Sequence, residues 1–206
     1  ELVDKGMAVL DLDETFDADA HHALARRAAG ESVVLLANDG ILPLAPGTSL
    51  AVVGEFARTP RFQGAGSSQV IPTRVDSLLD ELTALHDGTV TFAAGYGLDD
   101  HSADAGLRAA AVSVAAAADA VVVVIGLPGA DESEGFDRTH MDLPATQLET
   151  LAAVAEANAN VVVVLVNGST VVLGDVVPHC RALVEAWLGG QAAGGAIADV
   201  LTGRVN

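Results

Sequence analysis

Residues 131–140, DESEGFDRTH, hold the densest group of side chains in the sequence that can take part in acid–base chemistry, and they follow an apolar run at 120–126. The acids of this segment, with one just beyond it, are Asp131, Glu132, Glu134, Asp137 and Asp142. Mutual repulsion, or contact with an apolar side chain such as Phe136, raises a carboxyl pKa, and general acid catalysis requires a carboxyl protonated near neutral pH. We expect Arg138 to hold one of these acids. The alternative interpretation is a solvated acidic loop.

A second candidate segment, at 54–72, contains QGAGSS, in which two glycines stand close to two serines. Backbone N–H groups and hydroxyls of this kind can bind a polar ligand, but the third glycine of a dinucleotide-binding fingerprint is missing, which argues against nucleotide binding. Ser67 and Ser68 either form a polar wall of a site or order a tight turn by bonding to their own backbone. Arg58 and Arg61 are candidates to pair with the acids of the first segment.

Other catalytic chemistries find little support in the sequence. No G-x-S-x-G segment is present, which argues against a Ser-His-Asp hydrolase. The only lysine is Lys5, so the core offers no amine for a Schiff base or a P-loop. The six histidines do not stand at metal-ligand spacings, and we predict neither a metal site nor a cofactor. Cys180 is the only cysteine, so no internal disulfide can form.

The overall charge excludes one class of partner. Ten basic residues against 28 acidic ones give a net charge of −18, and such a surface repels a phosphate backbone. We therefore predict no nucleic-acid partner. The sequence also has no run of 18 apolar residues, and we predict no membrane association.

The elements that must position these segments follow from the hydrophobic pattern. Continuous apolar runs predict strands buried on both faces, at 49–53, 90–94, 120–125, 161–166 and 182–187. Helical stretches alternate with the strands, and residues 32–38 read as an edge strand. The alternation predicts an α/β fold, a three-layer sandwich with a mainly parallel, roughly six-stranded sheet between helices. Sites in such sheets form at the carboxyl ends of the strands, where both candidate segments begin.

Three smaller expectations concern single residues of this scheme. Thr73 is a candidate to cap a helix at 74–85. The NGST tract after the strand at 161–166 is expected to form a turn, although its Asn167 and Ser169 face the same sheet edge as the candidate segments. Trp187 ends the last strand and is expected to be a core residue, with a wall of the cleft as the alternative.

Five stretches, in order, resemble the C-terminal α/β sandwich domain of glycoside hydrolase family 3, the β-glucosidase group. They are ARRAAGESVVLLANDGILPL, AVVGEFARTPRFQGAGSSQVIPTRVDSL, ESEGFDRTHMDLPATQ, VVVVLVNGSTV and AWLGGQAAGGAIADVLTGRVN. The likeness runs from about residue 20 to the end of the sequence. GAG stands where GSG is frequent in the family, and VIPT stands where an asparagine often precedes the proline.

The resemblance implies retaining hydrolysis of O-glycosidic bonds, with a β-linked glucoside or oligosaccharide as substrate. In the family, an N-terminal (β/α)8 barrel carries an aspartate nucleophile, and the sandwich domain contributes the acid/base glutamate. That glutamate maps to Glu134, just before Gly135, with Glu132 as the reserve candidate. The candidate substrate-binding residues are Arg61, Ser67, Ser68, Asp137 and Arg138.

The barrel, and its motif with aspartate before tryptophan, are missing from this sequence. We therefore expect residues 1–19 to be a linker arm from a missing N-terminal barrel and residues 20–206 to be the sandwich domain. A fragment of this kind is predicted to be inactive alone. The alternative function is a non-catalytic carbohydrate-binding or interaction module with an α/β fold.

Overall fold

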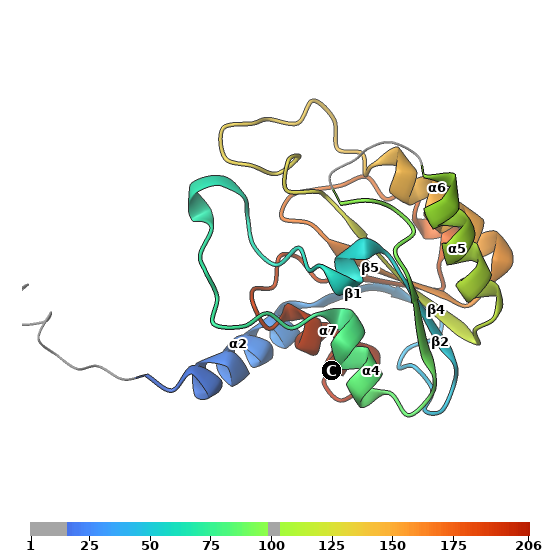
Figure 1. The fold of residues 1–206 in the computed structure, drawn as a ribbon, viewed down its shortest axis with the longest axis horizontal. Helices are drawn as coiled ribbons and strands as arrows, with labels where there is room; N and C mark the ends of the chain where they lie inside the picture. The colour runs from blue at the N-terminus through green and yellow to red at the C-terminus, as the bar shows by residue number, and fades with distance from the viewer. Residues whose placement is uncertain (1–15, 99–103) are drawn as a thin grey trace, which may run out of the picture.

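The computed structural model describes residues 16–98 and 104–206, which form a central β-sheet with helices on both faces (Figure 1). The strands are β1 (Val34–Asn38), β2 (Leu50–Val53), β3 (Val90–Ala93), β4 (Ala120–Gly126), β5 (Val161–Val166) and β6 (Ala182–Glu185). Their order is β1-β6-β5-β4-β2-β3, and each neighbouring pair is parallel except β1 with β6. The predicted α/β sandwich with a mainly parallel six-stranded sheet is confirmed.

The central strands are apolar except for Glu185 at the end of β6, because both faces of the sheet are covered. Every residue of β2, β4, β5 and β6 is buried. Valine dominates β4 and β5, and its branched Cβ suits the pleated backbone of a strand. The edge strand β1 differs, because all five of its residues are exposed. The hydrophobic core therefore lies around the four inner strands and supports the loops that leave their carboxyl ends.

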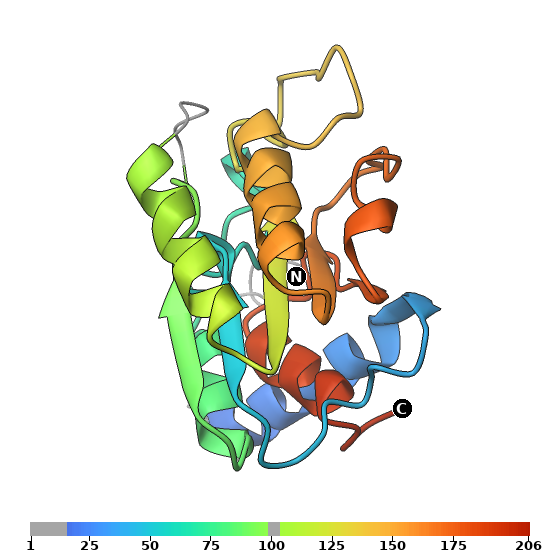
Figure 2. The same cartoon turned by 90° about the vertical axis from the view of Figure 1, so that its right-hand side faces the viewer.

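The helices divide into two groups on opposite sides of the sheet (Figure 1). Helices α5 (Ala105–Ala116) and α6 (Ala145–Ala157) pack together on one face, side by side in Figure 2. On the other face α7 (Ala193–Leu201) contacts both α2 (Ala18–Ser32) and α4 (Leu78–Leu85). The shorter elements are helix α3 (Glu55–Arg58) and the 3-10 turns η1 (Gly66–Ser68) and η2 (Val177–His179).

Arg26 connects the three helices of the second face, α2, α4 and α7, through ion pairs. Arg26 of α2 donates from Nε to Asp199 of α7 at 2.7 Å and from Nη1 to Glu81 of α4 at 2.7 Å. The hydrogen bonds and charges of these carboxylates raise the pKa of Arg26 above its ordinary value, against the effect of burial. Because the arginine bonds to both acids in a partly buried position, it contributes to the packing of α2 on the domain.

Two expectations about single residues are wrong. Helix α4 begins at Leu78 and is capped by Ser77, whose hydroxyl accepts the Asp80 N–H at 3.1 Å, so Thr73 lies too early in the chain to cap it. Strand β6 ends at Glu185, and Trp187 beyond it has a left-handed backbone, φ 57°, and is 42% exposed. The core role expected of Trp187 fails because the chain turns out of the sheet before it.

Most of the expected linker arm, residues 1–15, lies outside the described residues. Helix α2 starts at Ala18, and the Asp17 carboxylate caps it by accepting the Ala20 N–H at 2.9 Å. In the described parts of the chain, no helix combines the length and the apolar character needed to cross a membrane.

Candidate active site

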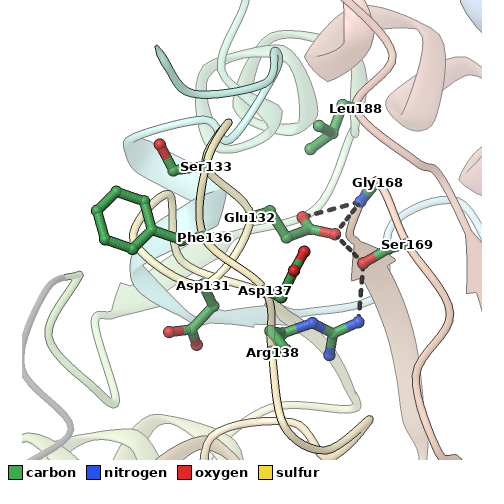
Figure 3. Close-up of a pocket in the computed structure, with 9 residues that line it drawn as sticks. All are labelled: Asp131, Glu132, Ser133, Phe136, Asp137, Arg138, Gly168, Ser169 and Leu188. Carbon is green, nitrogen blue, oxygen red and sulfur yellow. Dashed lines mark hydrogen bonds between the residues drawn. The ribbon is translucent and has the colours of Figure 1, made fainter.

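Four connections come together at the carboxyl edge of the sheet. The serine loop, defined as residues 59–77, follows α3, and the acid loop, residues 127–144, follows β4. A turn at 167–170 follows β5, and residues 186–192 follow β6. Together the acid loop, this turn and Leu188 line a cavity of about 380 Å³, which Figure 3 shows in close-up. The strand order thus gathers at one place the loops that the sequence singled out.

Glu132 is anchored by the protein itself. Gly168 N–H donates to its two carboxylate oxygens at 3.0 and 2.9 Å, and Ser169 Oγ donates to Oε1 at 2.5 Å (Figure 3). Arg61 Nη2 lies 3.3 Å from Oε2, and both side chains of this ion pair are only 8% exposed. With donors on both oxygens, Glu132 joins the acid loop to the turn at 167–170 and to the serine loop.

Glu134, two residues further on, lies on the exposed side of the acid loop and faces the serine loop. Ser67 N–H donates to its Oε2 at 3.1 Å, and the Ser67 hydroxyl donates to the same oxygen. The two loops also pair through an isolated parallel bridge between Ala65 and Ser133. Ser67 is therefore a direct partner of Glu134.

Gly66 is the residue that allows this approach. Its φ is +81°, which favours glycine, and a Cβ added to it would lie 2.8 Å from the Glu134 Cβ. A side chain at this position would push the serine loop away from Glu134. The glycine of QGAGSS next to the first serine therefore brings the loops together, and no nucleotide-binding geometry is needed to explain it.

The other candidate residues divide between the cavity and local roles. Asp137 and Arg138 both line the cavity, and Arg138 Nη2 donates to Ser169 Oγ at 2.8 Å and to Thr170 O at 2.9 Å. Ser68 Oγ donates to Ala65 O at 3.3 Å, which agrees with the tight-turn interpretation for this serine. Arg58, expected as a partner for the acid loop, instead pairs with Glu55 at 2.7 Å.

Arg61 holds the serine loop as well as Glu132. Its Nη1 donates to Gln63 O at 2.6 Å, while Nη2 reaches Glu132. Burial lowers the pKa of Arg61, and the charges of Glu132 and Asp131 act in the opposite direction. The Nε atom is buried without a hydrogen-bond partner among the described residues. The arginine thus links two loops from a largely buried position.

Glu185, the last residue of β6, is a residue of this region that was not predicted from the sequence. It is 5% exposed, and burial raises the pKa of its carboxyl, with a further contribution from the charge of Glu132. Its Oε1 accepts the Trp187 N–H at 2.9 Å, and its Oε2 accepts from Asn167 Nδ2 at 3.3 Å. The available signal was an acid at the end of an otherwise apolar strand, a place where a buried side chain is expected.

Comparison with known proteins identifies the family. The model of the glycosyl hydrolase family 3 C-terminal domain matches residues 33–206. This chain belongs to glycoside hydrolase family 3. The crystal structure of the Bifidobacterium adolescentis family 3 β-glucosidase superposes with a TM-score of 0.91 at 50% identity, over 99% of this chain. The expected resemblance is therefore confirmed, and the fold is that of the family's C-terminal domain.

Two curated relatives are also similar over nearly all of the chain. The exo-α-(1→6)-L-arabinopyranosidase of Bifidobacterium breve is 46% identical over 217 aligned residues, covering 100% of this chain. The thermostable β-glucosidase B of Acetivibrio thermocellus is 47% identical over 194 residues, covering 93% of it. The family 3 domain described here spans only 28% and 26% of these two proteins, and 30% of the B. adolescentis structure.

Proposed function

We propose that this domain supplies the general acid/base glutamate, Glu134, to a retaining glycosidase whose nucleophile lies in a (β/α)8 barrel outside this chain. The observation that carries the proposal is the difference between the two glutamates of the acid loop. Glu132 has donors from the protein on both oxygens, whereas Glu134 is exposed at the carboxyl edge of the sheet and its bonds to Ser67 engage one oxygen. The geometry therefore favours Glu134 over Glu132 as the group that meets a substrate.

The chemistry takes place in two steps. Glu134 first gives its proton to the glycosidic oxygen as the bond from that oxygen to C1 breaks and the barrel's aspartate bonds to C1. Glu134 then takes a proton from water as the water oxygen attacks C1 and the aspartate leaves. In a retaining enzyme the two carboxyl groups lie roughly 5 Å apart. A rigid sheet that presents Glu134 on a loop is suited to reach across to another domain.

Residues next to Glu134 have supporting roles in this proposal. Ser67 holds the carboxyl by two hydrogen bonds, and Arg61 holds the loop that carries Ser67. Asp137 and Arg138 line the adjoining cavity and are proposed to contact the sugar or its leaving group. Ser68, which lies in the same loop as Ser67, is also proposed to form part of the substrate-binding wall. A β-linked glucoside is the first substrate to test, and an α-L-arabinopyranoside is the second, because relatives carry both activities in their names.

The test uses Glu134→Ala in the full-length protein that contains this domain, with 2,4-dinitrophenyl and phenyl glycosides as substrates. The activated substrate needs no proton from the enzyme, whereas the phenyl substrate does. We expect the variant to lose about 10² to 10⁴-fold in rate on the phenyl glycoside, the range typical of general acid catalysis. On the dinitrophenyl glycoside the first step should remain fast, but hydrolysis of the glycosyl-enzyme should be slow because water lacks its general base. Sodium azide should restore turnover of this substrate and yield a glycosyl azide, because azide attacks C1 without a general base.

Glu132→Ala is the matched control for this experiment. It disturbs the anchoring of the same loop, so its rates should fall without azide rescue. Unchanged rates for Glu134→Ala, with sugar binding intact, would refute the proposal and favour the non-catalytic binding module. Azide rescue of Glu132→Ala alone would reverse the assignment of the two glutamates.

A further inference from the structure

A buried acid lies beneath the turn that anchors the acid loop. Glu185 closes β6 at 5% exposure, and the described residues that hydrogen-bond to its carboxylate, Asn167 and Trp187, are both neutral. Burial of a carboxyl without a cationic partner costs free energy, which an apolar residue of similar size would avoid. Position 185 is also the last residue of its strand, level with the base of the site. The acid is therefore placed where its bonds act on the site rather than on the core.

Asn167 connects Glu185 to the turn at 167–170. Its Nδ2 group donates to Glu185 Oε2 at 3.3 Å and to Ser169 O at 3.1 Å. Both neighbours are acceptors, which fixes the orientation of the amide, and Oδ1 is left buried with no partner among the described residues. The two bonds close the turn at 167–170 over Glu185. The turn thus has a direct hydrogen-bonded contact with the acceptor at position 185.

The turn in its closed form holds the acid loop. The N–H of Gly168 and the hydroxyl of Ser169 are the donors that bind Glu132. Gly168 is also packed closely, since a Cβ added to it would lie 2.9 Å from Leu188 Cδ1. From Glu132 the chain continues through Ser133, paired with Ala65, to Glu134. A continuous set of contacts therefore runs from the buried carboxyl of β6 to the segment that carries Glu134.

We propose that Glu185 is a positioning residue for Glu134, acting through Asn167, the turn at 167–170 and Glu132. The proposal rests on the function proposed above, because it assigns Glu185 to the accuracy of proton transfer by Glu134. Glu185 does not touch the substrate. Its loss displaces the acid loop, and a displacement of about 1 Å in a catalytic group can cost about 10²-fold in rate.

The experiment measures kcat/KM in the full-length protein for aryl glycosides whose leaving groups range from 2,4-dinitrophenol to phenol. The variants are Glu185→Ala, Glu185→Gln, Asn167→Ala and the Glu185→Ala/Asn167→Ala pair. We expect Glu185→Ala to lose about 10-fold or more on the phenyl glycoside but less than about threefold on the dinitrophenyl glycoside, because only the first needs a well-placed acid. Glu185→Gln keeps one acceptor oxygen and should fall between Glu185→Ala and the unmodified protein.

The double variant tests the route of the contact. If Glu185 acts through Asn167, the combined loss should be close to the larger of the two single losses, because both substitutions break the same connection. Additive losses would overturn the proposed route. Should Glu185→Ala fail to fold, Asn167→Ala and Glu185→Gln carry the same comparison of leaving groups.

His86→Asn is the matched control, since His86 is also a buried polar residue but bonds to Thr48 O at the opposite edge of the sheet. This variant should lower the stability of the protein, and any loss of kcat/KM should be the same for all leaving groups. Equal losses on all substrates for Glu185→Ala would make its role purely structural and overturn the inference. Glu134→Ala is measured in parallel. If the loss of kcat/KM is larger on the phenyl than on the dinitrophenyl glycoside for Glu134→Ala but not for Glu185→Ala, only the positioning role of Glu185 is refuted. If neither variant shows this difference between substrates, the function proposed for Glu134 is refuted as well.

Discussion

Substitution of Gly66 by alanine tests whether the close contact between the serine loop and the acid loop matters for activity. The residue has φ +81°, and the new Cβ would lie 2.8 Å from the Glu134 Cβ and 3.4 Å from its Oε2. Alanine in the left-handed region costs roughly 1–2 kcal/mol. The second effect is steric. Carbon atoms in good contact lie about 3.5–4.0 Å apart, so the loops must separate by about 1 Å.

Gly47→Ala is the control that isolates the steric effect. Gly47 has nearly the same φ, +77°, but apart from its chain neighbours no heavy atom of the described residues lies within 4 Å of an added Cβ, and it precedes β2 at the opposite edge of the sheet. Gly47→Ala should therefore lose roughly 1–2 kcal/mol in free energy of unfolding, and Gly66→Ala at least as much, because the contact with Glu134 adds to the backbone cost. In Gly66→Ala the separation of the loops also weakens the two Ser67 hydrogen bonds to Glu134. We expect about a 10²-fold loss of kcat/KM on a phenyl glycoside for Gly66→Ala only.

Two measurements check this pair of variants. Urea unfolding followed by circular dichroism gives the stability of each domain variant, and steady-state kinetics of the full-length variants gives kcat/KM. If both variants are equally active on the phenyl glycoside, the contact at Gly66 has no part in positioning Glu134. If Gly66→Ala is inactive on the dinitrophenyl glycoside as well, the damage extends beyond proton transfer, and the reasoning from a displaced acid fails.

Three further predictions concern the domain by itself. The isolated chain should not turn over an aryl β-glucoside, because general acid help of about 10² to 10⁴-fold is of little use without a nucleophile; turnover that disappears in Glu134→Gln would contradict this. Burial raises the pKa of Glu185, so the folded state binds a proton more tightly than the unfolded one. The stability of the unmodified chain relative to Glu185→Gln should therefore fall as pH rises above about 4.5, and level off above the folded pKa; urea unfolding at a series of pH values checks this, and a constant difference would refute it. Arg26→Met leaves Asp199 and Glu81 without their shared cation and should cost about 1–3 kcal/mol of unfolding free energy, between the values for exposed and buried ion pairs. The control Arg27→Met removes an exposed pair with Glu31 and should cost less than about 0.5 kcal/mol; equal losses in thermal or urea unfolding would contradict the role given to Arg26.

The layer architecture could be predicted from the sequence because the signals for it are local and strong. A run such as 161–166, six apolar residues with five valines, can be buried on both faces only in the middle of a covered sheet. The ends of elements were harder to predict. Trp187 continues an apolar pattern, yet the chain leaves the sheet after Glu185 and takes a left-handed conformation at the tryptophan, which hydrophobicity does not encode.

The gathering of the site loops could also be predicted, since parallel strands bring their carboxyl ends to one edge. The partners within the site could not. Arg58 and Arg61 stand three residues apart in one segment, but Arg58 is on helix α3 beside Glu55, while Arg61 lies in the serine loop and reaches Glu132. Glu185 was missed because its side-chain partner, Asn167, reaches it only when the ends of β5 and β6 are placed side by side. Its other partner, the N–H of Trp187, is local, two residues further along the chain.

The two glutamates of the acid loop show why sequence spacing cannot separate an anchoring acid from the one proposed to be catalytic. Glu132 and Glu134 have the same chemistry and lie two residues apart, so each fits the position that the family resemblance indicates. What distinguishes them is where their oxygens point. A carboxyl group that transfers a proton must bring an oxygen to the substrate, and both oxygens of Glu132 already accept hydrogen bonds from Gly168, Ser169 or Arg61. Using Glu132 as the acid would require breaking the link between three loops, whereas Glu134 is exposed and bound through one oxygen to a single residue, Ser67. On this argument the anchoring of Glu132 is a condition for the role of Glu134, so substitution of either should impair hydrolysis, but only loss of Glu134 should be repaired by azide.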